Sequence, residues 1–210
     1  MLSDDINATE VMALRNELKK DIEGLTILPF FIKALSMAMK EYPIVNSVVN
    51  PETDSEGYIK EYVIKKDHNF SVAIDSAHGL VTPIIKSVNT KSILEINSDL
   101  RNLVEKTKNN TLVQSDFDNG TFSVSSVGNL AGKYFVPTIL RPQAAIIAIG
   151  KSHKVPKYTG SGDNHSWEPI DNVGFSISAD HRILDGATVA RFTMKFKSYL
   201  ENPNLMLISA

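Results

Sequence analysis

The segment of this sequence that most strongly indicates a catalytic site is residues 176–186, SISADHRILDG. His181 and Asp185 stand four residues apart, after an apolar run that predicts a strand and before a predicted helix. A neutral imidazole at the end of a buried strand can take a proton from a thiol or hydroxyl near pH 7, so His181 is a candidate general base. Asp185 is a candidate N-cap of the helix. In the alternative interpretation, His181 bonds a core carbonyl and Asp185 only caps.

A second segment, residues 120–132 (GTFSVSSVGNLAG), predicts a strand that ends in small hydroxyl residues. One of Ser123, Ser125 and Ser126 could donate a hydrogen bond to a developing oxyanion. By default, however, serines in such a position are ordinary strand residues. The Gly-x-Ser-x-Gly pattern of a serine hydrolase is absent from the segment, which counts against a nucleophilic serine.

Composition removes several classes of function. None of the 210 residues is cysteine, which excludes disulfides, thiolate metal sites and a cysteine nucleophile. The five histidines lack a paired metal-ligand spacing, so we expect no metal. The net charge of −2 gives no reason to expect a nucleic-acid or membrane-surface partner. The apolar runs are far shorter than the roughly 20 residues that cross a bilayer.

The elements that must position these residues follow from apolar spacing. Helices are expected from near Asn7, with Asn7 as cap, from Pro29 to before Pro43, and over 92–106 and 186–200. Strands are expected at 58–65, 70–74, 80–85, 121–127, 144–149 and 173–178, with a turn at 77–79 and a hairpin-like excursion at 154–167. Because this order is no regular βαβ repeat, we expect one α/β domain of the α+β type with a mixed sheet.

Residues 180–186 spell Asp-His-Arg-x-x-Asp-Gly, which resembles the active-site motif of the dihydrolipoamide acyltransferases (E2 components) of 2-oxoacid dehydrogenase complexes. Residues 120–132 resemble that family's second active-site segment. The segments LPFFIKAL, YPIVNS, AIDSAHGLVTPII and RPQAAIIAIGK fall in the family's order, so the resemblance covers nearly the whole chain. The ending, SADHRILDGATVARF and then KSYLENPNLML, is most similar to the branched-chain members.

This resemblance implies a two-layer fold like that of chloramphenicol acetyltransferase, with a mixed sheet flanked by helices. It implies homotrimers with active sites between subunits, which assemble further into a 24-mer. The implied reaction transfers a branched-chain acyl group, isobutyryl-type, between dihydrolipoamide and coenzyme A. Because a thioester is already activated toward a thiol, this chemistry needs a base and an oxyanion donor but no metal or covalent nucleophile.

The resemblance also implies roles for particular residues. His181 would be the general base, Ser125 would donate its hydroxyl to the tetrahedral oxyanion, and Asp185 would hold the geometry by hydrogen bonding or ion pairing. Five residues lie in segments that line the coenzyme A side in the family: Ser36, Asp75, Ser126, Gly150 and Lys151.

Lipoyl and subunit-binding domains usually precede this domain in the family, and we expect neither here. Residues 1–210 are therefore expected to be an N-terminally truncated catalytic domain, with the lipoyl group delivered by a domain absent from this chain. Expected partners are that lipoyl domain and the E1 and E3 components of the complex. The expected location is the mitochondrial matrix in a eukaryote and otherwise the cytoplasm. Two alternatives stay open: the same chemistry with acetyl or succinyl groups, and a non-catalytic assembly scaffold.

Overall fold

The computed structural model describes residues 1–77, 79–127, 132–161 and 164–208. Its strands are β1 (Leu2–Asn7), β2 (Ser47–Val49), β3 (Tyr62–Ile64), β4 (Phe70–Ser76), β5 (Gly79–Val81), β6 (Ile84–Ile85), β7 (Phe122–Ser126), β8 (Ala145–Ser161) and β9 (Asn164–Ala179). Its α-helices are α1 (Thr9–Leu18), α2 (Leu28–Glu41), α3 (Ile93–Lys108), α4 (Gly186–Glu201) and α5 (Leu205–Ile208). Short 3-10 helices cover Pro43–Asn46, Val88–Thr90 and Gln114–Asp116.

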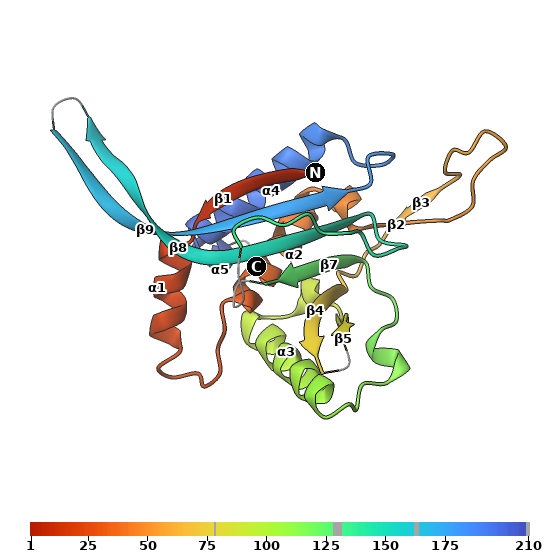
Figure 1. Cartoon of the computed structure of the whole chain (residues 1–210), viewed down its shortest axis with the longest axis horizontal. Coiled ribbons are helices and arrows are strands. Elements are labelled where there is room, and N and C mark those ends of the chain that lie inside the picture. The colour runs from red at the N-terminus through yellow and green to blue at the C-terminus, as the bar shows by residue number, and fades with distance from the viewer. Residues whose placement is uncertain (78, 128–131, 162–163, 209–210) are drawn as a thin grey trace.

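One mixed sheet organises the molecule (Figure 1). In the described part of the chain its strand order is β1-β9-β8-β7-β4-β5, and β6 also pairs with β4. The β4–β7 and β7–β8 pairs are parallel, whereas β8–β9 and β9–β1 are antiparallel. The prediction of a mixed sheet is therefore confirmed. Among the helices that the structure describes, none combines the length and the hydrophobicity of a membrane-spanning segment.

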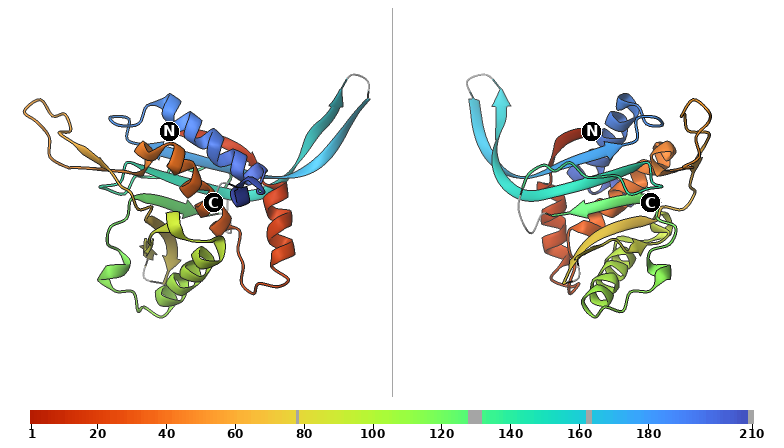
Figure 2. Two further views of the ribbon diagram at one scale, coloured as in Figure 1. Left: turned by 180° about the vertical axis from the view of Figure 1, so that it is seen from behind. Right: turned by 45° about the vertical axis from the view of Figure 1, so that its right-hand side comes forward.

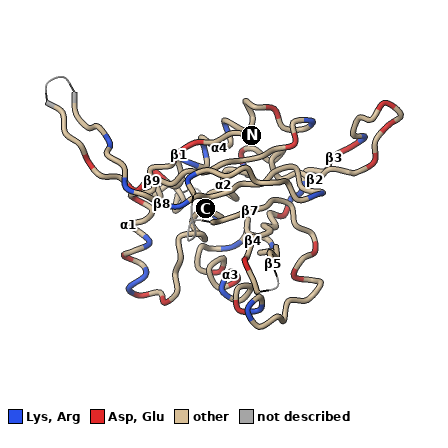
Figure 3. The backbone as a smooth tube through the Cα atoms, in the orientation of Figure 1, with Lys and Arg blue, Asp and Glu red and all other residues tan. Residues whose placement is uncertain are grey.

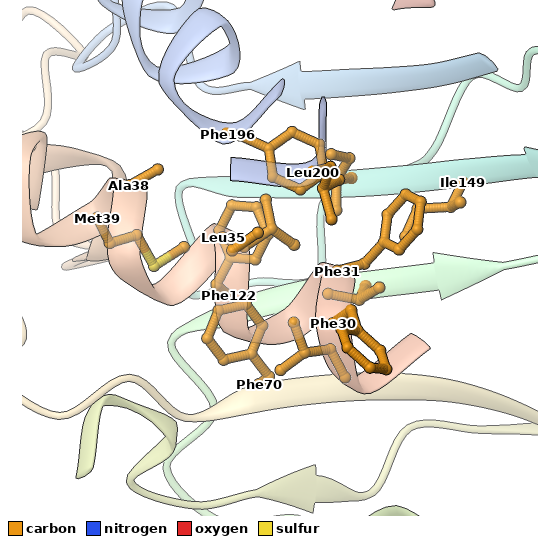
Figure 4. Packing of buried hydrophobic residues seen from close by; sticks show 14 of the residues in the cluster. Phe30, Phe31, Leu35, Ala38, Met39, Phe70, Phe122, Ile149, Phe196 and Leu200 are labelled. Atoms are coloured by element: carbon orange, nitrogen blue, oxygen red, sulfur yellow. The ribbon is translucent and has the colours of Figure 1, made fainter. Parts of the chain in front are cut away.

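Helices α2 and α4 cover one face of the sheet, as the view from behind shows (Figure 2). The buried residues of α2 run without a break from Pro29 to Met39, because apolar residues occupy nearly all of its sides. Phenylalanines dominate the contact between this helix, the sheet and α4 (Figure 4). Phe31 meets Phe196 edge-on at 6.1 Å, and Phe70 meets Phe122 at 5.5 Å. Burying each of these rings contributes about 1.5–3 kcal/mol to folding.

Helix starts follow the capping rules, with one correction. Ser92 caps α3 in a reciprocal capping box with Glu95, as Ser–x–x–Glu predicts. The predicted Asn7 cap of α1 is wrong, because Asn7 is the last residue of β1 and the N-cap position falls on Ala8. Asn7 still accepts hydrogen bonds from Thr9, at 3.3 Å from the backbone N–H and 2.7 Å from the hydroxyl.

Two ribbons project from opposite sides of the body (Figure 1). Strands β8 and β9 continue past the sheet as a long antiparallel arm, paired from Ser152 with Val173 outward. This arm is the predicted 154–167 excursion. The β2–β3 ribbon is the other projection, and β3 is shorter than the predicted strand at 58–65. Acidic and basic residues are interspersed over the body (Figure 3). The predicted turn at 77–79 contains His78, which lies outside the described residues.

Candidate active site

The turn that follows β9 is fixed by backbone hydrogen bonds. The Asp180 N–H donates to the Ala144 carbonyl at 2.8 Å, which ties the turn to the start of β8. The Asp180 carbonyl accepts from the N–H groups of Ile183 and Leu184, at 3.0 and 2.9 Å. Leu184 is buried in the core, so the turn is held from inside as well. His181 is thus carried on a defined turn.

The His181 side chain is exposed. Among the described residues its ring makes no hydrogen bond, so the alternative in which it bonds a core carbonyl is not observed. A hollow of about 190 Å³ adjoins it, and its lining includes Met1, Leu2, Leu184 and Val189. An imidazole with both nitrogens free beside such a hollow can act as a base toward a bound thiol.

Asp185 caps α4, as predicted. Its carboxylate accepts hydrogen bonds from the Thr188 N–H at 2.8 Å and the Thr188 hydroxyl at 2.9 Å. The backbone hydrogen bond from Thr188 is the main reason why the pKa of this carboxyl lies below its ordinary value, and the hydroxyl adds to it. Asp185 therefore stays ionised at neutral pH and fixes the first turn of α4 directly after the His181 turn.

Ser125 lies near the end of β7, opposite Ala148 of β8. Phe122 and Val124 of the same strand are buried in the core, and alternation places Ser123 and Ser125 on the other face. Ser123 is occupied there, since its hydroxyl donates to the Gln143 side chain. The half-buried Ser125 hydroxyl has no side-chain hydrogen bond within the described ranges, so it can donate to a ligand.

The structure does not bring Ser125 and His181 together within one chain. The row through Ser125 crosses β8 at Ala148 and β9 at Ser176, two strand spacings or about 10 Å away. Asp180, bonded to Ala144, lies four residues or about 13 Å farther along. The two side chains therefore belong to opposite ends of the sheet, and neither can reach the other's ligand in the same chain.

Four of the five residues expected on the coenzyme A side gather at the Ser125 end of the sheet. Ser126 pairs with Ile149, directly before Gly150 and Lys151. Asp75 lies two residues beyond the row that joins Ala73 to Ser125. Contact of these residues with coenzyme A stays a prediction. Within the described ranges no three His, Asp or Glu side chains gather where they could share a metal ion.

Gly150 also has a packing role. A Cβ atom at this position would lie 2.2 Å from the Lys133 carbonyl oxygen. A Cβ at Gly174, on the neighbouring strand, would lie 2.5 Å from the same oxygen. The two glycines thus let the chain at Lys133 pass close over the sheet.

Ser36, the fifth residue, is separated from this group. It is 1% exposed, and its hydroxyl bonds the ring Nδ1 of the buried His68 at 2.8 Å. Burial, followed by the positive charge of Lys40, lowers the pKa of His68 to about 4, so its ring is neutral at pH 7. Ligand contact by Ser36 stays a prediction that this burial does not favour.

Sequence reasoning did not predict the contact between Asp180 and Arg182. The Arg182 guanidinium donates to both Asp180 carboxylate oxygens, from Nε at 2.9 Å and Nη2 at 2.6 Å. The Arg182 N–H adds a third bond at 3.1 Å. The only sequence signal was a pair of opposite charges on either side of the histidine.

Comparison with solved structures first identifies the fold. The chain superposes on chloramphenicol acetyltransferase with a TM-score of 0.58, at 13% identity, covering 95% of this chain and 86% of that one. This likeness confirms the predicted fold class of a mixed sheet flanked by helices.

Sequence comparison identifies the family of this chain. Residues 1–208 match the family described as 2-oxoacid dehydrogenases acyltransferase (catalytic domain), and the chain belongs to that family. A branched-chain relative from Arabidopsis thaliana, the mitochondrial lipoamide acyltransferase component of the branched-chain alpha-keto acid dehydrogenase complex, is 40% identical over 98% of this chain. An acetyltransferase component of the pyruvate dehydrogenase complex, from Acholeplasma laidlawii, is 34% identical over the whole chain and 37% of its own length.

Solved structures of acetyltransferase cores are also similar to this chain. The dihydrolipoamide acetyltransferase of Azotobacter vinelandii matches with a TM-score of 0.87 and 30% identity, covering 98% of this chain and 82% of that one. The study of that structure addressed a serine, a histidine and an asparagine in catalysis, and that histidine and asparagine stand four positions apart. The cubic core of a pyruvate dehydrogenase multienzyme complex gives the same TM-score. This chain spans 41% of the length of the Arabidopsis relative.

Proposed function

We propose that this chain is the acyltransferase core of a branched-chain 2-oxoacid dehydrogenase complex. It transfers an isobutyryl-type acyl group between dihydrolipoamide and coenzyme A. Support comes from the family match and from the higher identity to the branched-chain relative, 40% against 34% for the acetyltransferase from Acholeplasma laidlawii. Mitochondrial relatives favour the mitochondrial matrix as the location in a eukaryote.

In the proposed reaction, His181 removes the proton from the thiol of one substrate, and the thiolate attacks the thioester carbonyl of the other. The Ser125 hydroxyl donates a hydrogen bond to the carbonyl oxygen as negative charge develops on it. The tetrahedral intermediate then collapses, its bond to the departing sulfur breaks, and the His181 imidazolium returns the proton to that sulfur. Ser126, Asp75, Gly150 and Lys151 lie on the coenzyme A side.

The separation of His181 from Ser125 within one chain is the main structural support for an active site between subunits. Because one chain cannot bring both side chains to one carbonyl, the working site joins His181 of one subunit to Ser125 of the next. A cyclic homotrimer closes three such sites without leaving an open end. The match to a cubic core supports further assembly to a 24-mer. The lipoyl domain and the E1 and E3 components are the proposed partners.

Acyl transfer from isobutyryl-CoA and from acetyl-CoA to dihydrolipoamide tests the proposal. We expect isobutyryl to be preferred, with kcat reduced about 10³-fold by His181→Ala and about 10²-fold by Ser125→Ala. Ser126→Ala is the matched control and should raise KM for isobutyryl-CoA while leaving kcat nearly unchanged.

Other outcomes decide between the alternatives. Preference for acetyl-CoA would assign the acetyl specificity instead. No transfer from any donor by an intact assembly would leave the non-catalytic scaffold as the function.

A further inference from the structure

A cluster of polar contacts outside the residues with assigned roles flanks His181. Asp180 and Arg182, on either side of it, are joined by three hydrogen bonds, two from the guanidinium and one from the Arg182 backbone N–H. A two-pronged guanidinium–carboxylate contact is stronger and more directional than a single contact between a lysine and a carboxylate. The Asp180 side chain is 16% exposed, so solvent competes weakly for its oxygens.

Every polar group of Asp180 is used to shape the turn. Its N–H is bonded to Ala144, its carbonyl accepts from Ile183 and Leu184, and its carboxylate accepts from Arg182. The ring of His181, between the two charged residues, makes no hydrogen bond within the described ranges. The contacts therefore fix the backbone on both sides of the base while leaving its nitrogens free.

We propose that Asp180 and Arg182 form a positioning pair that holds the His181 turn in the shape needed for proton transfer at the subunit boundary. This inference rests on the proposed function. A base supplied by one subunit must meet a thiol bound against another, and an error of about 1 Å in such an alignment can cost 10²-fold in rate. The pair reduces this error with bonds internal to its own chain, before any neighbour is present.

The pair also balances charge beside the base. Arg182 and Asp180 each lie next to His181 in sequence, and their charges cancel while both are present. Other charged groups near this region are unchanged by the test: Arg141 near Asp180, Asp185 on the same turn and Arg191 near Asp185. Removing one member of the pair therefore leaves one uncompensated unit charge near the imidazole.

The test measures kcat and the pH profile of kcat/KM for isobutyryl transfer by the assembled protein. We expect Asp180→Asn and Arg182→Gln each to lower kcat roughly tenfold to a hundredfold. Asp180→Asn leaves Arg182 positive, which disfavours imidazolium, so the acid limb moves to lower pH. Arg182→Gln leaves Asp180 negative and moves the limb to higher pH. Each displacement should be about 0.3–1 pH unit, and the double variant should return the limb to its wild-type position.

Two further variants sharpen the result. Arg182→Lys keeps the charge and loses the two-pronged contact, so the limb should stay in place while kcat falls. The matched control is the Lys154–Asp171 pair of the β8–β9 arm, joined at 2.7 Å, with a similar division between an exposed cation and a sheltered carboxylate. Asp171→Asn should change neither kcat nor the profile.

The failures are distinguishable. If His181→Ala is inactive but Asp180→Asn and Arg182→Gln keep the wild-type kcat and profile, the inference is wrong and the proposed function stands. A lower kcat without displacements of the acid limb in opposite directions would also overturn the inference. A general loss of structure lowers kcat but gives no reason for the two variants to shift the limb in opposite directions. If His181→Ala retains full activity, the proposed function falls and the positioning role falls with it.

Discussion

The turn that carries His181 and the end of β7 that carries Ser125 differ in how their polar side chains are bonded. At the His181 end, the carboxylates of Asp180 and Asp185 each accept several hydrogen bonds from their own chain. At the Ser125 end, the hydroxyls of Ser125 and Ser126 make no side-chain hydrogen bond within the described ranges. The two carboxylates beside His181 are thus held by their own chain, whereas these two hydroxyls can donate to a ligand. This difference is expected if the first end delivers a base and the second receives the substrate carbonyl.

Mixing subunits tests this division most strongly. His181→Ala and Ser125→Ala chains are each expected to be nearly inactive alone. If random trimers form from equal amounts, about one quarter of the sites combine an intact His181 with an intact Ser125 across a boundary. Co-assembly by refolding the mixture should therefore restore about a quarter of the wild-type rate. Mixed assemblies as inactive as their parents would place both residues in sites confined to one chain.

A second test compares two histidines, the exposed His181 and the buried His68. The folded pKa of His68 is about 4, below its ordinary 6.5, because burial disfavours the charged ring. The unfolded chain takes up this proton first as pH falls, so the free energy of unfolding should drop by about 3 kcal/mol between pH 6.5 and 4. Denaturant unfolding across that range should show a weaker pH dependence for His68→Gln. The exposed His165→Gln is the control, and an equal slope in both variants would contradict the burial argument.

Glycine substitutions give the next largest effect. Gly150→Ala places a methyl group against the Lys133 carbonyl at the Ser125 end, and we expect a loss of about 1–3 kcal/mol in unfolding free energy. At the other end, a Cβ at Gly186 meets nothing within 4 Å, so Gly186→Ala should change stability by less than about 1 kcal/mol. Denaturant midpoints measure both. Equal losses would mean that the close approach at Gly150 carries no constraint.

The smallest effect is expected at the cap of α4. Asp185→Ala removes the acceptor for Thr188 and should cost about 1 kcal/mol, whereas Asp185→Asn keeps an acceptor and should retain most of the stability. Thermal unfolding of the two variants measures the difference. An unchanged melting temperature in Asp185→Ala would show that the cap is not needed for the His181 end to fold.

Strong apolar periodicity predicted the helices α2, α3 and α4. The strand expected at 80–85 is divided at Pro83 into β5 and β6, because proline has no N–H to donate to the sheet. Edge strand β1 was missed because LSDDIN has only two large apolar residues. The strand is stabilised by pairing with β9, which lies near the other end of the sequence. The Asn7 cap failed for the same reason. Local propensity cannot show that a residue is already committed to a sheet.

Residue types indicated His181, Asp185 and Ser125, but spacing could not show where they lie relative to one another. Their opposite placement depends on the parallel β7–β8 pair and the antiparallel β8–β9 pair, which are long-range contacts. Ser36 was expected near a ligand, but its hydroxyl bonds the ring of the buried His68 instead. A small polar residue among apolar neighbours in the sequence does not indicate such a partner. The Asp180–Arg182 contact likewise requires a turn whose shape the sequence does not specify.

The distance between His181 and Ser125 has a consequence for inheritance and gene dosage. If the active site joins His181 of one subunit to Ser125 of the next, as proposed, chains that lack only His181 can be mixed at random with intact chains. The active fraction of sites then falls in proportion to the defective share, because a defective chain still supplies its serine to a neighbour. A chain that lacks both residues removes sites on two boundaries, so activity falls as the square of the intact share. Of two null alleles, the one with the larger lesion would then be the more dominant.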